Sequence, residues 1–204
     1  MASDKTLNDR AEPLRVMGGH WPDWDRARIE VLDDLGRADG AQTMRRNPFE
    51  SVLHADRLKE YLKHLPDFED EEAEQRALAF AAAYPDFDRG LQFLATWPAP
   101  AAAASMVLAR HGEMSGDHYW YLTDTAAHLD KDHPLAATLI LRAMIGFALD
   151  RGRSKRYPHA AHHLKTCAYL SRRIDDWAGH PDHDTYVADL NARHGRKSGF
   201  WNAV

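Results

Sequence analysis

The strongest pattern in the chain is a nearly continuous apolar run from His133 to Gly152. Its interruptions fall at every fourth position, which on a helix makes one narrow stripe: Thr138, Arg142, Gly146 and Asp150. Apolar side chains cover the rest of the circumference, so the run predicts a helix packed on most sides. Pro134 suits its first turn, and Gly152 suits a left-handed stop. The run is short for a membrane span and carries Arg142 near its middle, so we expect a central core helix.

Helical spacing of apolar residues recurs along the rest of the chain, and no convincing alternating strand is present. The predicted helices cover 23–35, a segment from 39 that Pro48 kinks or splits, 54–65, 71–83, 87–97, 101–111, 117–129 and 158–171. A last helix starts at Asp182 or Asp184 and stops at Gly195. Asp117 is expected to cap the helix that follows it. With the central helix, this makes about ten helices joined by the short turns typical of antiparallel neighbours.

A small internal repeat supports the same architecture. The motif Leu65-Pro66-Asp67-Phe68 recurs 19 residues later as Tyr84-Pro85-Asp86-Phe87. Each copy is expected to supply a helix-stopping proline, a capping aspartate and a buried aromatic ring. One helix plus one turn fills this offset, so two copies predict an antiparallel hairpin. We therefore expect an all-α fold of stacked antiparallel hairpins, a tetratricopeptide-like α-solenoid over residues 23–204, after a loosely ordered segment at 1–22.

Composition and charge restrict the class of protein. The chain has 204 residues, of which 44% are hydrophobic and 28% charged, which is typical of a soluble globular protein. Its net charge of -5 does not favour nucleic-acid binding in general. The charge is uneven, with -7 in residues 1–104 and +2 in residues 105–204. A single cysteine excludes an internal disulfide, and no apolar run follows the N-terminus, so we expect a cytoplasmic protein.

A basic segment is the first candidate site. Seven basic residues and no acidic residue lie between Arg151 and Arg173. The start of this segment precedes a predicted helix, whose free backbone N–H groups suit a phosphate or a carboxylate. The candidate anion-binding residues are Arg151, Arg153, Ser154, Lys155 and Arg156. Nucleic acid is one possible anion, and the alternative is a solvated turn that balances the acidic first half.

Histidines form the second candidate site. A metal could be held by members of a C-terminal cluster: His159, His162, His163, His180 and His183. No HExxH motif is present, and with 13 histidines in the chain the alternative is that these are exposed or capping residues. Cys167 lies four residues after His163, but its position on an apolar stripe favours a packed core thiol over a nucleophile. No phosphate-binding loop or catalytic triad motif is present, and no cofactor is expected.

Aromatic side chains are candidates for partner contact. Three consecutive rings cannot all face inward from one helix, so at least one of Tyr119, Trp120 and Tyr121 should be exposed. Trp201 in the C-terminal tail is a further candidate. For the tail we predict that Phe200 or Trp201 folds back and covers the open end of the helical stack, and the competing idea is an exposed docking peptide that a partner binds through Trp201. We also expect Arg142 to have a carboxylate or carbonyl partner, because an unpaired charge on so apolar a helix is costly.

Several segments resemble an uncharacterised bacterial family whose C-terminal region is helical and tetratricopeptide-like. They are HPLAATLILRAMIGFALDRGRSKRYPHAAHHLKTCAYL, HPDHDTYVADLNARHGRKSGFW and YLKHLPDF, and the ending HGRKSGFW is the most specific. A weaker likeness is to the helical tails of SWIM-type zinc-finger proteins, whose zinc-binding cysteines are absent here. The resemblance implies the helical fold and no catalytic residues.

The pattern as a whole favours a non-catalytic module for protein–protein interaction or scaffolding, with an unidentified protein partner and no membrane association. Two other classes of function remain open. One is an anion or nucleic-acid binding module that uses the basic segment 151–173. The other is a metal-dependent enzyme that uses the C-terminal histidines.

Overall fold

The computed structural model describes residues 22–66 and 68–204, so nearly all of the segment expected to be loosely ordered lies outside it. The described residues form eleven α-helices, two short 3-10 helices and no strand, which confirms the all-α class. The α-helices are α2 (Pro22–Asp34), α3 (Ala38–Val52), α4 (Ala55–Lys63), α5 (Glu69–Ala82), α6 (Phe87–Thr96), α7 (Pro100–Arg110), α8 (Tyr119–Leu129), α9 (Pro134–Asp150), α10 (Tyr157–Ser171), α11 (His183–His194) and α12 (Ser198–Trp201). The 3-10 helices are η1 (His111–Glu113) and η2 (Ser154–Arg156).

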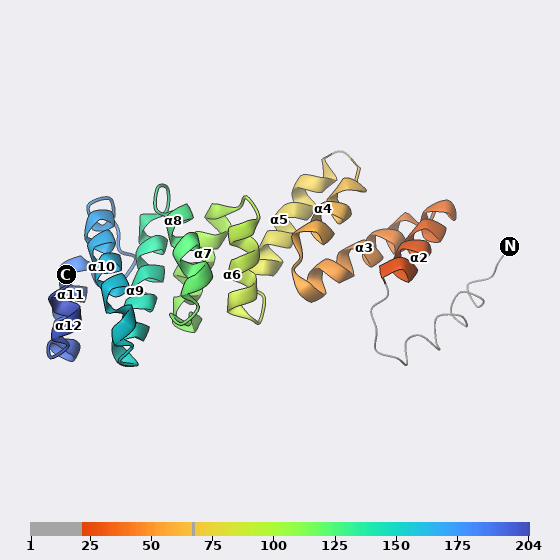
Figure 1. Cartoon of the computed structure of the whole chain (residues 1–204). Coiled ribbons are helices and arrows are strands. Elements are labelled where there is room, and N and C mark those ends of the chain that lie inside the picture. Colours follow the sequence, from red (N-terminus) through yellow and green to blue (C-terminus); the bar gives the residue numbers. More distant parts are fainter. Residues whose placement is uncertain (1–21, 67) are drawn as a thin grey trace.

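The helices stand side by side in an elongated array, with α2 at one end and α11 and α12 at the other (Figure 1). Each helix from α2 to α10 packs against the next one along the chain. Helices two apart also touch, as α5 does with α7, α7 with α9, and α6 with α8. Successive helices therefore alternate between two layers, which is the arrangement expected of stacked hairpins. No helix in the described part of the chain is long and apolar enough to cross a bilayer.

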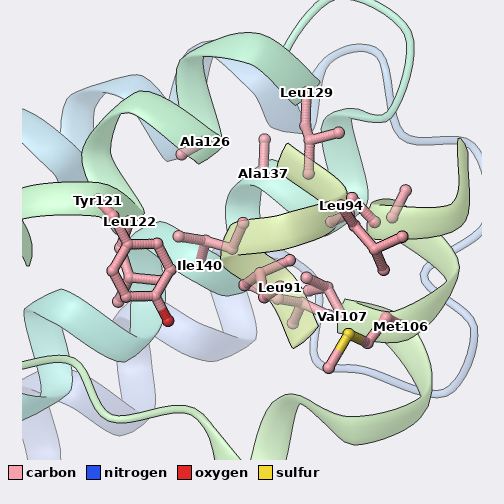
Figure 2. Close-up of a cluster of buried hydrophobic side chains, with 14 of the residues drawn as sticks. Leu91, Leu94, Met106, Val107, Tyr121, Leu122, Ala126, Leu129, Ala137 and Ile140 are labelled. Atoms are coloured by element: carbon pink, nitrogen blue, oxygen red, sulfur yellow. The ribbon is translucent and has the colours of Figure 1, made fainter. Parts of the chain in front are cut away.

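The core is continuous along the array. Side chains from α6, α7, α8 and α9 meet in its middle, among them Leu91, Val107, Leu122 and Ile140 (Figure 2), and all four are fully buried. The central helix α9 is buried on most sides, as its apolar run predicted. Burial of apolar surface is the main stabilising contribution to such a fold. Because each helix buries its apolar face only against neighbours, the order of helices sets the order of core contacts.

Local signals place most of the helix ends where expected. Pro134 occupies the first turn of α9, and Gly152 ends it with φ +60°, in the left-handed region that favours glycine. The carboxylate of Asp86 accepts from the N–H of Arg89 at 3.1 Å and caps α6. Asp182 caps α11 in the same way. The structure thus selects Asp182 over Asp184 as the start of the last long helix.

Two expectations were wrong. The ring of Phe68 is 90% exposed, because the residue adopts a left-handed conformation at φ +74° that turns it outward, whereas its counterpart Phe87 is buried. Asp117 does not cap α8; its carboxylate accepts a hydrogen bond from Arg156 instead. In both cases a tertiary contact or backbone conformation overrides a local preference. Of the two alternatives for Pro48, a kink or a split, the structure excludes the split, since α3 runs through the proline.

Arg142, the charged residue in the middle of α9, has polar partners, as expected for a charge on so apolar a helix. Arg142 donates from Nη1 to the carbonyl oxygen of Pro181 at 2.7 Å and from Nη2 to that of Asp182 at 3.1 Å. Its guanidinium also lies over the rings of Trp177 and Tyr186, at 4.8 and 4.2 Å from their centroids. These contacts attach the turn before α11 to the middle of α9, so the expectation of a carbonyl partner is confirmed.

The C-terminal tail folds back on the last helices. It forms α12, which packs against α10 and buries Phe200 completely. The ring of Phe200 lies edge-on to that of Tyr157, with 6.3 Å between their centroids. Trp201 is half-buried, and its indole Nε1–H donates to the carbonyl oxygen of His194 at 3.0 Å. The tail therefore covers the end of the array, as one of the two expectations for it stated.

Candidate functional site

A groove lies between α8 and α10 and has α9 as its floor. Its volume is about 330 Å³, and its lining includes no acidic residue. The walls combine basic, imidazole, aromatic and small side chains: Gly116, Tyr119, Thr123, Met144, Ala148, Lys155, Arg156, His159, Ala160, His162 and His163. We call this the α8–α10 groove. It brings together members of all three residue sets that the sequence singled out, namely basic, histidine and aromatic.

The basic wall comes from the turn between α9 and α10. Lys155 is exposed, and it has no ion pair or side-chain hydrogen bond with any described residue. Arg156 is held in place, because Nη1 donates to the Asp117 carboxylate at 2.8 Å and the guanidinium lies over the Tyr119 ring at 4.5 Å. No side chain caps the start of α10, whose positive dipole end adds to this charge. Lys155 is therefore the cation most available to a ligand.

The histidines line the other side, on the first turns of α10. His163 is the most enclosed of them, and burial lowers its pKa to about 4, with a further contribution from the neighbouring His162 and His159. His163 is therefore uncharged at neutral pH and can donate one hydrogen bond and accept another. The groove thus offers a free ammonium, a fixed guanidinium and three imidazoles, of which that of His163 is neutral, above an apolar floor.

The remaining members of the anion-binding prediction do not join the groove. Arg151 lies on a different pocket beside α9, and Arg153 and Ser154 are exposed on the turn without contributing to the lining. Only Lys155 and Arg156 of the five predicted residues line the groove. Neighbouring residues of η2 are rotated by about a third of a turn from one another, so their side chains point in different directions and cannot all line one groove.

The predicted metal ligands are divided among three places. His159, His162 and His163 line the groove, whereas His180 lies edge-on to His111 in another pocket, with 4.6 Å between ring centroids. His183 begins α11. No group of three or more His, Cys, Asp or Glu side chains in the described residues could hold a metal ion. The structure thus does not assemble the predicted site, because the five histidines are not gathered within reach of one metal ion.

The four aromatic candidates differ in how far they are exposed. Tyr119 and Trp120 are 52% and 60% exposed, as at least one ring had to be, and Tyr119 lines the groove. Tyr121 is buried, and its hydroxyl donates to the Asp88 carboxylate at 2.6 Å. Burial and that carboxylate raise the pKa of Tyr121. Trp201 belongs to the tail contact described above, so Tyr119 and Trp120 are the exposed rings among these four candidates.

Cys167 is not a nucleophile in this setting. The thiol is fully buried between α10 and α9, and burial raises its pKa to about 12. A reactive cysteine needs a lowered pKa and access to substrate, and this one has neither. The groove itself is lined by one hydroxyl besides the Tyr119 phenol, that of Thr123, which donates to the Tyr119 carbonyl oxygen at 2.8 Å. With its basic and imidazole side chains, the groove can accept an anionic group.

Sequence reasoning missed the floor of the groove and the partner of its arginine. Met144 and Ala148 lie four residues apart on α9 and face the groove together. Their spacing was visible, but on a helix buried nearly all round it could not identify which apolar residues border a cavity. Asp117 lies 39 residues before Arg156, and only the packing of α8 and α10 against α9 brings them together.

The chain has no match among curated proteins and none among solved structures. A model of a protein family of unknown function matches residues 4–203, nearly the whole chain. The expectation of an uncharacterised family is thereby confirmed. The chain belongs to the family of unknown function DUF6880.

Proposed function

We propose that this protein is a non-catalytic, tetratricopeptide-like interaction module whose α8–α10 groove receives an acidic segment of a partner protein. The observation that carries the proposal is the lining of the groove, which has basic and imidazole side chains and no acidic one. Stacked helix hairpins commonly present such extended surfaces to partners. The alternation of helices between two layers supports the likeness to tetratricopeptide repeats.

The composition of the groove suits a peptide that carries both acidic and apolar side chains. Lys155 and the start of α10 attract carboxylates, and the imidazoles can donate hydrogen bonds to them. Met144 and Ala148 on the floor can bury a small apolar side chain next to the acidic ones. The exposed ring of Tyr119 at the edge provides a rigid contact surface. Charge complementarity would then steer the partner, and the apolar floor would add affinity.

A protein segment fits better than a nucleic acid. The whole chain carries a net charge of -5, and its first 104 residues carry -7, so a long polyanion would be repelled outside the groove. Nucleic-acid binding draws its affinity from many phosphate contacts along a basic surface. Here the groove supplies only two basic side chains, Lys155 and Arg156, in a volume of about 330 Å³. That volume accommodates a few side chains of a peptide.

The proposal is tested by fluorescence anisotropy with the full chain. The probe is a fluorescein-labelled peptide of about ten residues in which glutamate and leucine alternate. A peptide with glutamine in place of glutamate measures the contribution of charge, and a single-stranded DNA of equal charge measures the alternative ligand. We expect the acidic peptide to bind most tightly and its affinity to fall with added salt.

Matched charge reversals locate the binding surface. Lys155→Glu should lower the affinity for the acidic peptide about tenfold, because it reverses the free cation of the groove. Lys131→Glu makes the same charge change at an exposed position on the turn between α8 and α9 and should leave the affinity nearly unchanged. Equal effects of the two variants, or equal binding of the glutamine peptide, would reject the groove. Tighter binding of the DNA would replace the protein partner by a nucleic acid.

A further inference from the structure

Arg142 is a buried cation without a carboxylate partner. Arg142 is 8% exposed. Its guanidinium donates two hydrogen bonds, to the neutral carbonyl groups of Pro181 and Asp182. Its Nε is buried and has no hydrogen-bond partner. None of the described carboxylates forms an ion pair with it. A buried charge that is only partly compensated is costly, which makes its surroundings attractive to an anion.

Arg142 lines a second pocket, of about 580 Å³, on the side of α9 that carries the polar stripe. We call it the α9 pocket. Arg142, Gly146 and Asp150 of the stripe contribute to it, and Leu139 and Phe147 add apolar surface. The opposite walls come from the loop after η1 and from the turn before α11. Its volume lies within the range of pockets that hold small ligands, about 300 to 1,000 Å³.

Imidazole groups stand opposite the stripe. His111 and His180 line the pocket with their rings in an edge-on contact. The pKa of His180 is lowered, chiefly by burial and further by His111 and Arg142. A neutral imidazole can still donate one N–H to a ligand. The two rings come from segments about 70 residues apart in the sequence, so the stacking of helices creates this pair.

The fixed charges around the pocket favour an anion. Arg142 and Arg151 are positive, and Asp150 is the single acidic residue of the lining. The Asp150 carboxylate is already engaged from outside, with His194 Nε2 at 2.9 Å and Arg193 Nη1 at 3.8 Å. Two arginines against one carboxylate leave the lining with a net positive formal charge. A metal ion or an organic cation would be disfavoured there.

Gly146 keeps part of this pocket open. A Cβ atom at this position would meet only the Asp150 carboxylate, at 3.9 Å, so the space above the glycine is empty of protein atoms. Glycine inside a helix is less favourable than alanine by about 1 kcal/mol. No close helix contact requires a glycine here, in contrast to Gly116, where a Cβ would overlap the Ala143 carbonyl. The missing side chain at Gly146 thus serves the pocket, not the packing of α9.

We propose that the α9 pocket binds a carboxylate attached to a short apolar group. The carboxylate would lie near Arg142 and accept hydrogen bonds from His111 or His180, and the apolar group would lie over Gly146 against Leu139 and Phe147. This site is separate from the α8–α10 groove, with which its lining shares only Gly116. Two sources supply this chemistry, a small carboxylic acid and the C-terminal carboxylate of a peptide.

The test follows binding by ¹H–¹⁵N NMR of the full chain. The probes are hexanoate, hexanamide, an acetylated peptide that ends in leucine with a free carboxylate, and the same peptide as its amide. We expect saturable shifts of the Ser115, Gly146 and His180 amides with the carboxylates. The neutral amides should bind at least about tenfold more weakly. Preference for the peptide acid would identify a chain terminus as the ligand, and preference for hexanoate would identify a small acid.

Two variants of the pocket and one control variant test whether the carboxylate binds in the pocket, and none of them changes Arg142. Gly146→Leu fills the open space and should abolish the shifts while keeping the fold, since leucine is a better helix former than glycine. Ala79→Leu adds the same side chain at an exposed position of α5 and should bind like the parent. His111→Phe keeps the ring contact but removes the N–H, and should weaken binding several-fold.

The results of the carboxylate titration test the α9 pocket independently of the α8–α10 groove. Absence of saturable shifts up to about 10 mM carboxylate, which corresponds to very weak binding, would overturn the proposal. Equal binding of hexanoate and hexanamide, or unchanged binding by Gly146→Leu, would overturn it as well. Lys155→Glu in the α8–α10 groove should leave hexanoate binding unchanged, so failure of one site does not decide the other.

Discussion

Single residues gain their roles here from contacts that are distant in sequence. Arg142 interrupts an apolar helix, and the cost of a buried charge predicts that it has a polar partner. The sequence could not identify the partner, because the carbonyl groups of Pro181 and Asp182 lie 39 and 40 residues away. Every residue has a backbone carbonyl, so the sequence does not indicate which one accepts a hydrogen bond. Arg142 was therefore predictable as a paired residue, whereas its role beside the α9 pocket was not.

His163 makes the stability of the protein depend on pH. Burial lowers its pKa to about 4, below the ordinary 6.5, so the unfolded chain binds a proton that the folded chain does not between these values. This contribution to stability is complete above pH 6.5 and is lost as the pH falls toward 4. Urea unfolding at about pH 7 and about pH 5 should show a loss on the order of 1 kcal/mol from this residue.

The variant His163→Gln separates this effect from the other titrating groups. It removes the imidazole but keeps a hydrogen-bonding side chain of similar size. The loss of stability between the two pH values should be smaller in the variant than in the parent. An identical loss in both proteins would show that His163 is not desolvated in the folded state.

At the scale of elements, apolar periodicity, prolines and glycines predicted the helices well. The ends of α9 at Pro134 and Gly152 followed from local rules. The repeated motif at residues 65–68 and 84–87 was less reliable, because Phe87 is buried but Phe68 is exposed. The two copies share sequence, yet their chain conformations differ at the aromatic residue. A short motif does not determine the backbone when the flanking helices pack differently.

Close packing between elements predicts an effect at Gly116. A Cβ there would overlap the carbonyl group of Ala143 on α9 and come within 2.8 Å of Phe147 Cβ. Gly116→Ala should therefore force the loop before α8 away from α9 and destabilise the protein by about 1–3 kcal/mol, as overpacking does. Gly112→Ala is the matched control, since a Cβ at that position has no atom within 4 Å. Denaturant unfolding should separate the two variants, and equal midpoints would contradict this close approach.

At the scale of the whole molecule, the helices form an array with two different ends. The acidic first half and the slightly basic second half of the sequence lie toward opposite ends of it (Figure 1). Both proposed binding sites lie in the second half, around the central helix α9. The C-terminal end is covered by α12, which buries Phe200. Such a cover is expected, because the last helix of an array has no further neighbour to bury its outer face.

Removal of the tail tests this cover. Deletion of residues 198–204 should lower the free energy of unfolding by at least about 1.5–3 kcal/mol, the contribution of one fully buried aromatic ring. Deletion of Val204 alone removes an exposed residue and should have little effect. Binding of the acidic peptide to the α8–α10 groove should survive the longer deletion at a temperature where the protein is folded. Unchanged stability with lost peptide binding would instead make the tail a docking segment.

The sequence by itself determined the all-α class, the number of helices to within about one, and most of their ends. These features depend on local rules, since apolar spacing, prolines and capping residues act within a few positions. Tertiary structure alone decided which candidates meet. It placed His163 and Lys155 in the same groove but His180 in another pocket, and it paired Arg156 with Asp117. The reason is that helical periodicity specifies which face of a helix is buried, whereas the neighbour on that face depends on how the helices stack.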